Sequence, residues 1–218
     1  MAPYPLPPVC RSEVLRYAGC CSETPELSAL LTQTILEAQP LITPGLCWQS
    51  FPLKAEGNVL DFTFASTDSP SLARHLSGCE RVVVFAATVG LPIDRLIYRY
   101  GKTAPAKALL LQAIGAERIE ALCDSFQEQI RQEAAKEGLS ITSRFSPGYG
   151  DLPLAFQQEI FRILDCPRKI GLTLNDSLLM SPSKSVTAII GIGMSAHMDC
   201  AAGCARCAKT DCIHRRTL

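Results

Sequence analysis

The longest helical segment expected in this chain runs from Pro105 to Lys136, and it constrains the fold more than any other feature. Apolar residues recur in it at helical spacing: Ile119, Leu122, Phe126 and Ile130. Gly138 follows at a position where a residue with left-handed backbone conformation commonly ends a helix. One apolar stripe of this length requires other elements of the chain to pack against it.

Shorter elements surround this segment. Further helices are predicted at 12–18, 25–38, 68–76, 92–100 and 154–164. Strands are predicted at 46–53, 59–65, 81–87, 140–145 and 185–192. The β-branched run 81–87 indicates a buried central strand. Strands 46–53 and 59–65 are expected to pair as a hairpin, because turn residues Glu56, Gly57 and Asn58 lie between them.

The order of these elements predicts the α+β class, with an antiparallel or mixed sheet flanked by helices, because strands and helices do not alternate regularly. Three parts are expected: an N-terminal helical segment at 1–40, an α+β core at 41–192 and a cysteine-rich, metal-binding tail at 193–218. The last boundary is the clearest, since apolar periodicity ends there.

Charge and hydropathy restrict the class of partner. Lys plus Arg and Asp plus Glu both number 21, so no strong field favours nucleic acid or an anionic membrane. A small molecule or another protein is the expected partner. The first eight residues lack the features of a signal peptide, and the apolar runs 82–89 and 108–114 are too short to span a bilayer. The sequence therefore predicts a soluble, cytoplasmic protein without a membrane partner.

Four cysteines cluster near the C-terminus with the spacing C-x3-C-x2-C-x4-C: Cys200, Cys204, Cys207 and Cys212. In a chain without signs of secretion, this density favours a metal over disulfides. The spacing suits either zinc or an iron–sulfur cluster. The other seven of the eleven cysteines are scattered through apolar sequence, where most are expected to be small buried side chains.

An ordered set of motifs makes part of the chain recognisable. Arg144-Phe-Ser-Pro147-Gly148-Tyr149 resembles the Arg-x-x-Pro-Gly-Tyr signature of the reactivation domain of cobalamin-dependent methionine synthase. Downstream, Met180-Ser-Pro182-Ser-Lys-Ser185-Val186 resembles the family's Met-x-Pro-x-x-Ser-Val strand. Upstream, the stretch around Glu120 is similar to the family's long helix with an acidic residue facing the ligand. The resemblance covers roughly residues 85–190.

The resemblance implies a fold and a role. In this family the domain binds S-adenosylmethionine (SAM) and covers a cobalamin that has been oxidised to inactive Co(II). An electron donor reduces the cobalt, and SAM supplies the methyl group that restores methylcobalamin. Since reduction of Co(II) is uphill, the irreversible methyl transfer draws it forward. The same role is expected here, with no catalytic residue assigned.

The resemblance also implies which residues bind SAM: Arg144, Ser146, Gly148, Tyr149 and Glu120. Arg144 is expected to bind the ligand carboxylate through two parallel donors, and Glu120 to face the ammonium or sulfonium. Gly148 allows close backbone approach, and Tyr149 offers an apolar ring with a hydroxyl. From the residues alone, a surface arginine, a Pro-Gly turn with a packing tyrosine and a solvated glutamate remain alternatives.

Two departures from the family pattern stand out. Gly150 and Asp151 replace the proline that usually follows the Gly-Tyr pair, so a more flexible or differently bent loop is expected. The family continues after the Ser-Val strand with an aromatic pair that helps to hold SAM, whereas here Gly191 to Met194 lead directly into the cysteines. Part of the expected pocket is missing or rebuilt.

Within these 218 residues there is no corrinoid-binding domain and no room for the homocysteine and folate barrels. The sequence therefore predicts a stand-alone reactivation subunit that acts on a separate methionine synthase or other corrinoid protein. The tail is expected to relay the electron, which favours an iron–sulfur cluster slightly over zinc. The alternatives are a zinc-stabilised docking partner without redox chemistry and an unrelated SAM-dependent methyltransferase.

Overall fold

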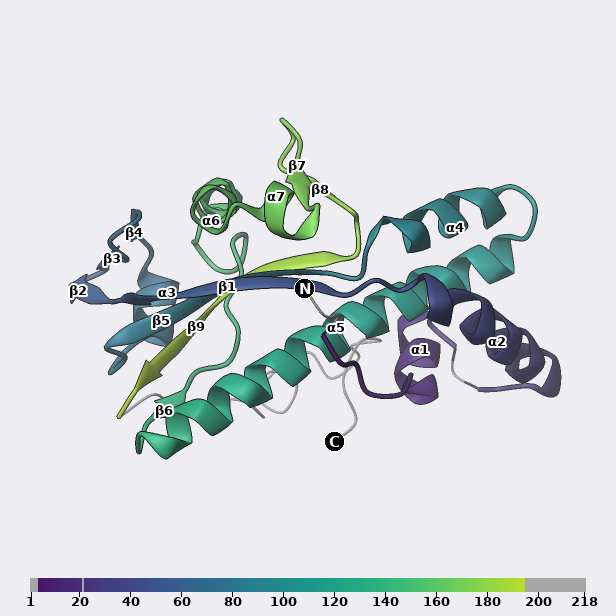
Figure 1. Ribbon diagram of the computed structural model, residues 1–218, viewed down its shortest axis with the longest axis horizontal. Coiled ribbons are helices and arrows are strands. Elements are labelled where there is room, and N and C mark those ends of the chain that lie inside the picture. Colours follow the sequence, from purple (N-terminus) through teal and green to yellow (C-terminus); the bar gives the residue numbers. More distant parts are fainter. Residues whose placement is uncertain (1–3, 21, 195–218) are drawn as a thin grey trace.

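The computed structural model describes residues 4–20 and 22–194, in which a four-stranded antiparallel sheet lies between two groups of helices (Figure 1). The sheet contains β1 (Gly45–Pro52), β5 (Arg81–Thr88), β9 (Ser185–Gly193) and β6 (Ser140–Ile141) in the order β1-β5-β9-β6. Each pair of neighbours is antiparallel. The α+β class, the flanked sheet and the central position of the 81–87 strand are thereby confirmed.

Strand β5 occupies the centre because it is apolar on both faces. Successive side chains of a strand point to opposite faces. Val83 and Phe85 belong to one buried cluster, while Val82 and Val84 belong to the other, and all four are at most 2% exposed. The sheet consequently has a hydrophobic core on each side, and each core needs its own cover of helices.

One face is covered by α1 (Arg11–Tyr17), α2 (Pro25–Ala38), α4 (Leu91–Gly101) and α5 (Pro105–Lys136), with the 3₁₀ turn η1 (Gln39–Leu41) after α2. Figure 1 shows α5 crossing beneath the whole sheet. At the end of α5, Gly138 has a φ of 73°, and Leu139 N donates to Ala134 O at 3.0 Å. This is the glycine-dependent helix end that the sequence predicts.

The opposite face is covered by α3 (Pro70–His75), η2 (Leu154–Phe156), α6 (Gln157–Leu164) and α7 (Cys166–Ile170). Side chains from these elements pack on Val82, Val84 and Ile189 of the sheet. A two-stranded sheet of β7 (Thr173–Leu174) and β8 (Met180–Ser181) extends beyond this layer. In Figure 1, α6, α7, β7 and β8 lie above the sheet, on the side away from α5.

The predicted hairpin between strands 46–53 and 59–65 is wrong. Strand β1 pairs with β5 along its whole length, from Gly45 opposite Thr88 to Pro52 opposite Arg81. The turn at Gly57 and Asn58 instead joins β2 (Lys54–Glu56) to β3 (Val59–Asp61), and β4 (Ser66–Asp68) completes this small separate sheet. The turn residues were identified correctly, but the strand that precedes them leaves the main sheet after Pro52.

The predicted strand 140–145 is shorter than expected. Only Ser140 and Ile141 form β6, after which the chain touches β9 again through a single bridge between Phe145 and Ile189.

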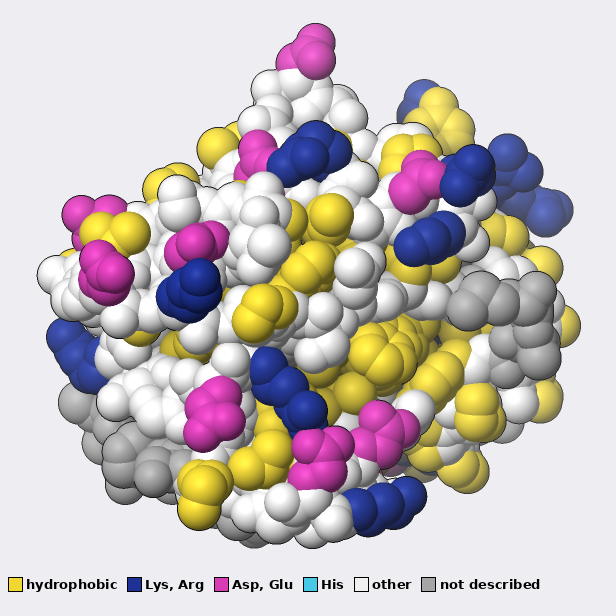
Figure 2. Space-filling model, turned by 60° about the vertical axis from the view of Figure 1, so that its left-hand side comes forward, with side chains coloured by type: hydrophobic (Ala, Val, Ile, Leu, Met, Phe, Trp, Pro, Cys, Tyr) yellow, Lys and Arg dark blue, Asp and Glu magenta, His cyan; other side chains and the backbone are white. Residues whose placement is uncertain are grey.

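Two global expectations concern charge and membranes. Among the described residues, none of the helices combines the length and the apolar character that a membrane span requires. On the face drawn in Figure 2, acidic and basic side chains are interspersed around a band of hydrophobic ones, without a large patch of one sign. The arrangement on this face agrees with the balanced charge of the sequence.

Candidate functional site

The long helix α5 presents three polar side chains on the face that looks toward the 143–149 segment: Glu120, Asp124 and Gln127. Their spacing of four and three residues places them in successive turns of one helix face. The opposite side of α5 carries Leu122, Phe126 and Ile130, which are buried against the sheet. The apolar stripe fixes the rotation of α5 and thereby points the polar row outward.

Facing this row is the 143–149 segment, which β9 holds in place. Thr142 N donates to Gly191 O at 2.9 Å, and the backbones of Phe145 and Ile189 exchange two hydrogen bonds of 2.9 Å. Because neighbouring side chains of an extended segment point in opposite directions, Arg144 turns toward α5 while Phe145 packs in the core on the other face. The chain thus aims the guanidinium at the carboxylates.

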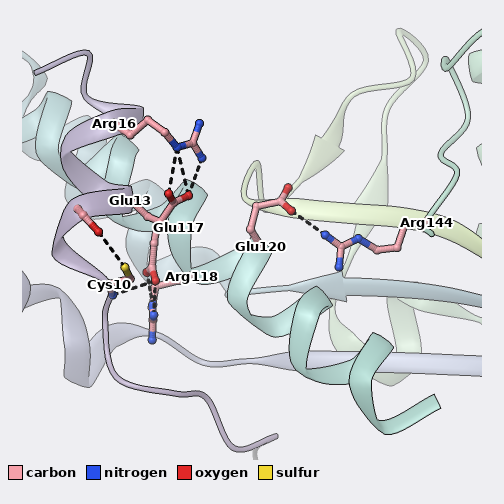
Figure 3. A network of polar contacts seen from close by, with 8 residues as sticks. Cys10, Glu13, Arg16, Glu117, Arg118, Glu120 and Arg144 are labelled. Carbon is pink, nitrogen blue, oxygen red and sulfur yellow. Dashed lines mark hydrogen bonds and ion pairs between the residues drawn. The ribbon is translucent and has the colours of Figure 1, made fainter. Parts of the chain in front are cut away.

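The Arg144 guanidinium lies between two carboxylates of α5. Its Nη2 donates to Glu120 Oε2 at 2.9 Å and its Nη1 to Asp124 Oδ1 at 2.7 Å, and its side chain is only 17% exposed. Figure 3 shows Glu120 reaching from α5 toward Arg144. Burial lowers the pKa of Arg144, but Cys123, Asp124 and Glu120 outweigh burial, so the pKa rises above its ordinary value. Arg144 is therefore a permanent cation.

The next residues form a tight turn. Tyr149 N donates to Ser146 O at 3.0 Å, Pro147 occupies the second position, and Gly148 has a φ of 89° in the third. This combination is typical of a type II turn, which needs glycine at that position. The Tyr149 side chain is 60% exposed beside the hollow, with its ring centroid 6.1 Å from that of Phe145.

Gly150 and Asp151, which replace the expected proline, bend the loop back onto α3. Gly150 has a φ of 54°. The Asp151 carboxylate accepts hydrogen bonds from the Ser69 hydroxyl and from the backbone and hydroxyl of Ser71 at the start of α3. These bonds, from Ser69 first and then from Ser71, hold the pKa of Asp151 below its usual range. The departure from the family pattern thus ties the turn to the layer opposite α5.

Together these elements enclose a hollow of about 230 Å³, here named the Arg144 hollow. It is lined by Glu120, Asp124, Gln127, Ser143, Arg144, Ser146, Tyr149 and Val186. Four of the five residues predicted to bind SAM line it, and the fifth, Gly148, shapes the turn beside it without being part of the lining.

Sequence reasoning missed Asp124, Gln127, Ser143 and Val186. A signal for Asp124 and Gln127 was present, because they follow Glu120 at helical spacing on a segment already predicted to be helical. Ser143 had no such signal, since its position depends on the break of the strand after Ile141.

The charges of the hollow suit a ligand that carries both signs. One guanidinium and two carboxylates give the cluster a net charge of −1. A ligand carboxylate can take the place of one acidic partner of Arg144, while a ligand ammonium occupies the released carboxylate. The ion pairs of the free protein are then exchanged for equivalent ones, so no buried charge is left without a partner. These residues fit the amino-acid end of SAM.

No metal site is formed by the described parts of the chain, in which there is no group of three or more potential ligands. The predicted metal ligands Cys200, Cys204, Cys207 and Cys212 lie outside the described residues. Of the six described cysteines, Cys47, Cys123 and Cys166 are buried, and burial raises the pKa of Cys123 to about 12. A thiol with so high a pKa is not a reactive group at neutral pH.

The fold that carries this hollow is found in a protein of known structure. A crystal structure of the MetH reactivation domain bound to AdoHcy has the same fold, with a TM-score of 0.59 at 19% sequence identity. The similarity covers 76% of this chain but 65% of that one, so the chain spans less than two thirds of the solved domain. A comparison with curated proteins found no match.

A family profile gives the assignment. The family described as "Vitamin B12 dependent methionine synthase, activation domain" matches residues 71–204, which is more than half of the chain. The match includes the polar row of α5, the turn that contains Gly148 and the strand β9. The chain therefore belongs to the activation-domain family of vitamin B12-dependent methionine synthase.

Proposed function

We propose that this chain binds SAM in the Arg144 hollow and delivers its methyl group to the cobalamin of a separate methionine synthase or other corrinoid protein during reductive reactivation. The observation that carries the proposal is the Arg144 guanidinium held between Glu120 and Asp124 in a hollow built from family-matched residues. The solved relative binds AdoHcy, which has the same amino-acid and adenosyl groups as SAM. The proposal places this chemistry in the cytoplasm.

Five of the lining residues have a defined task in binding: Glu120, Asp124, Arg144, Ser146 and Tyr149. Arg144 donates to the ligand carboxylate in place of one of its two acidic partners, and the released carboxylate of Glu120 or Asp124 accepts from the ammonium. Ser146 and the backbone beside Gly148 approach the ligand closely, and the exposed Tyr149 ring covers it. When bound, SAM supplies an electrophilic methyl group and leaves as S-adenosylhomocysteine. The protein's part is to orient that methyl group toward the cobalamin that the partner presents.

The electron is the second requirement. We propose that Cys200, Cys204, Cys207 and Cys212 hold an iron–sulfur cluster that relays it from an external donor, because such clusters reach potentials several hundred millivolts below zero. The competing proposal is a zinc site that only stabilises a docking surface. Metal and acid-labile sulfide analysis of anaerobically purified protein separates them. Stoichiometric zinc without iron, sulfide or visible absorption would contradict the cluster.

Binding is tested by calorimetric titration of SAM into the purified protein and into Arg144→Ala. Removing the buried cation leaves two carboxylates facing each other and the ligand carboxylate without a donor, so affinity should fall about 30-fold or more. Arg162→Ala is the matched control, since Arg162 forms an exposed pair with Glu159 on the opposite side of the sheet. Equal affinity in the Arg144 variant would remove this site from the proposal.

Reactivation is tested by mixing the protein with a corrinoid protein in its Co(II) state, a low-potential reductant and SAM labelled in its methyl group. The expected result is labelled methylcobalamin on the corrinoid protein. Complex formation without methyl transfer would instead favour the docking function. Methylation of another acceptor while the corrinoid stays unmodified would favour an unrelated methyltransferase.

A further inference from the structure

A second hollow adjoins the Arg144 hollow on the other side of the acidic residues of α5. It has a volume of about 430 Å³ and is lined by Pro7, Pro8, Cys10, Glu13, Tyr17, Glu117, Glu120, Ala121, Asp124 and Ser125. We name it the N-terminal groove. Glu120 and Asp124 line both hollows, so these two residues stand between the two spaces.

The Arg144 hollow is too small to hold SAM by itself. Its volume of about 230 Å³ lies below the range of about 300–1,000 Å³ in which pockets enclose most of a drug-sized ligand. The purine and ribose of SAM must therefore lie outside it. The N-terminal groove is the adjoining space, and it has the larger volume of the two.

The wall of the N-terminal groove is firmly built. Arg118 donates to Pro7 O at 2.6 Å and to Pro8 O at 3.1 Å, while Glu117 accepts from Cys10 N at 3.0 Å. Glu117 and Arg118 pair with each other at 2.5 Å with side chains only 5% and 4% exposed. Figure 3 shows this pair beside the start of α1, with Glu120 and Arg144 further to the right. A buried ion pair thus fixes the N-terminal segment on α5.

The order of charged and apolar side chains across the two hollows matches the order of chemical groups along SAM. A cation, Arg144, stands at one end, the carboxylates of Glu120 and Asp124 stand in the middle, and the N-terminal groove lies at the other end. SAM runs from carboxylate through ammonium and sulfonium to adenosine. The groove offers apolar surface from Pro7, Pro8, Tyr17 and Ala121, and polar acceptors from Glu13 and Ser125. Such a mixture suits a purine and the hydroxyl groups of a ribose.

We infer that the adenosyl half of SAM lies in the N-terminal groove, with the sulfonium beside Glu120 and Asp124 and the purine against Tyr17. The Arg16 guanidinium lies 4.1 Å from the centroid of the Tyr17 ring and pairs with Glu13, so the ring is held in position. The inference rests on the proposed function. It assigns a binding role to residues 7–17, which lie outside the family match at 71–204.

The test titrates three compounds by calorimetry: SAM, 5′-methylthioadenosine, which lacks the amino-acid end, and methionine, which lacks the adenosyl end. Tyr17→Ala should lower the affinity for SAM and for methylthioadenosine about tenfold and leave the affinity for methionine unchanged. Arg144→Ala should lower the affinity for SAM and for methionine and leave the affinity for methylthioadenosine unchanged. Ala121→Phe, which fills the groove from α5, is a second groove variant, and Tyr98→Ala, at an 81% exposed position on α4, is the control.

The outcomes separate this inference from the proposed function. One outcome is that Arg144→Ala lowers the affinity for SAM, while Tyr17→Ala and Ala121→Phe bind SAM as wild type does and keep its melting temperature. In that case the groove assignment is overturned and the proposed function stands. If only the groove variants lose affinity, the groove is supported and the Arg144 site is overturned. A wild-type protein that binds no SAM would overturn both.

Discussion

Asp124 shows how one residue changes the chemistry of the site. Without it, Arg144 and Glu120 would form a neutral pair; with it, the cluster carries a net charge of −1. SAM carries a net charge of +1, whereas S-adenosylhomocysteine, which lacks the sulfonium, is a neutral zwitterion. The cluster therefore provides a physical basis for holding the methyl donor more tightly than the product.

This selectivity gives a prediction. Asp124→Asn should reduce the affinity for SAM on the order of tenfold, about 1.4 kcal/mol, and change that for S-adenosylhomocysteine much less. Parallel calorimetric titrations of both ligands measure the ratio. Glu128→Gln, which removes an exposed charge from the same helix, serves as the control. An unchanged ratio in Asp124→Asn would contradict the electrostatic account.

Asp151 gives a second prediction at this scale. Its carboxylate accepts hydrogen bonds at the start of α3, and its pKa is lowered in the folded protein. The stabilisation is therefore complete above the unfolded pKa of about 3.9 and is lost as the pH falls through the folded value. Asp151→Asn should lower the melting temperature at pH 7, and the difference from wild type should shrink in acid. Asp176→Asn, in an exposed loop, should show neither effect.

At the scale of elements, the buried pair of Glu117 and Arg118 joins the N-terminal segment to α5. Both side chains are at most 5% exposed, and Arg118 also holds the carbonyls of Pro7 and Pro8. Glu117→Gln should destabilise the fold by about 3–5 kcal/mol, because it leaves a buried guanidinium without its counter-ion. Denaturant unfolding measures the loss. A change as small as that of an exposed control such as Glu133→Gln would show that the pair is dispensable.

Most helices and the central strand followed from local patterns, whereas the length of the 140–145 strand, several short elements and one pairing did not. Gly138 ends α5 as the sequence predicts, and Thr24 caps α2 at the start of the helix predicted over 25–38. The predicted partner of β1 was wrong, because the alternation of apolar and polar residues shows which side chains face the core but not which strand lies alongside. Strand β5, buried on both faces, takes β1 as its second neighbour, and the nearby turn at Gly57 serves the small sheet instead.

The site was partly predictable for a similar reason. A linear motif identifies Arg144 and Tyr149, and resemblance to a family helix identifies Glu120, so these three could be named from the sequence. Asp124 follows Glu120 at helical spacing, but many polar residues on that helix face solvent, so its selection also needs the position of the 143–149 segment. The N-terminal groove depends on contacts between residues more than a hundred positions apart, such as Cys10 and Glu117. No local pattern encodes such contacts.

At the scale of the whole molecule, the described domain and the cysteine motif can be tested as separate functions. The net charge of the chain is zero, so the proposed attraction of SAM depends on the local cluster around Arg144 and not on a global field. Changing Cys204 and Cys207 together to Ser should leave SAM affinity within about twofold of wild type and abolish methylcobalamin formation, because the proposed electron relay is lost while the Arg144 hollow is unchanged. Parallel loss of SAM binding would show that the two functions are inseparable.

The alternation of Arg144 and Phe145 has a consequence for how this chain tolerates changes in length. One side chain faces the Arg144 hollow and the next packs in the opposite core, and β9 fixes that register through hydrogen bonds to Thr142 and Phe145. Inserting or deleting a single codon between these two anchors would turn the guanidinium into apolar surroundings and the phenyl ring into the hollow. Such a frame-preserving change is expected to be as damaging as losing the arginine, whereas length changes in the exposed loop at 175–179 leave the site intact.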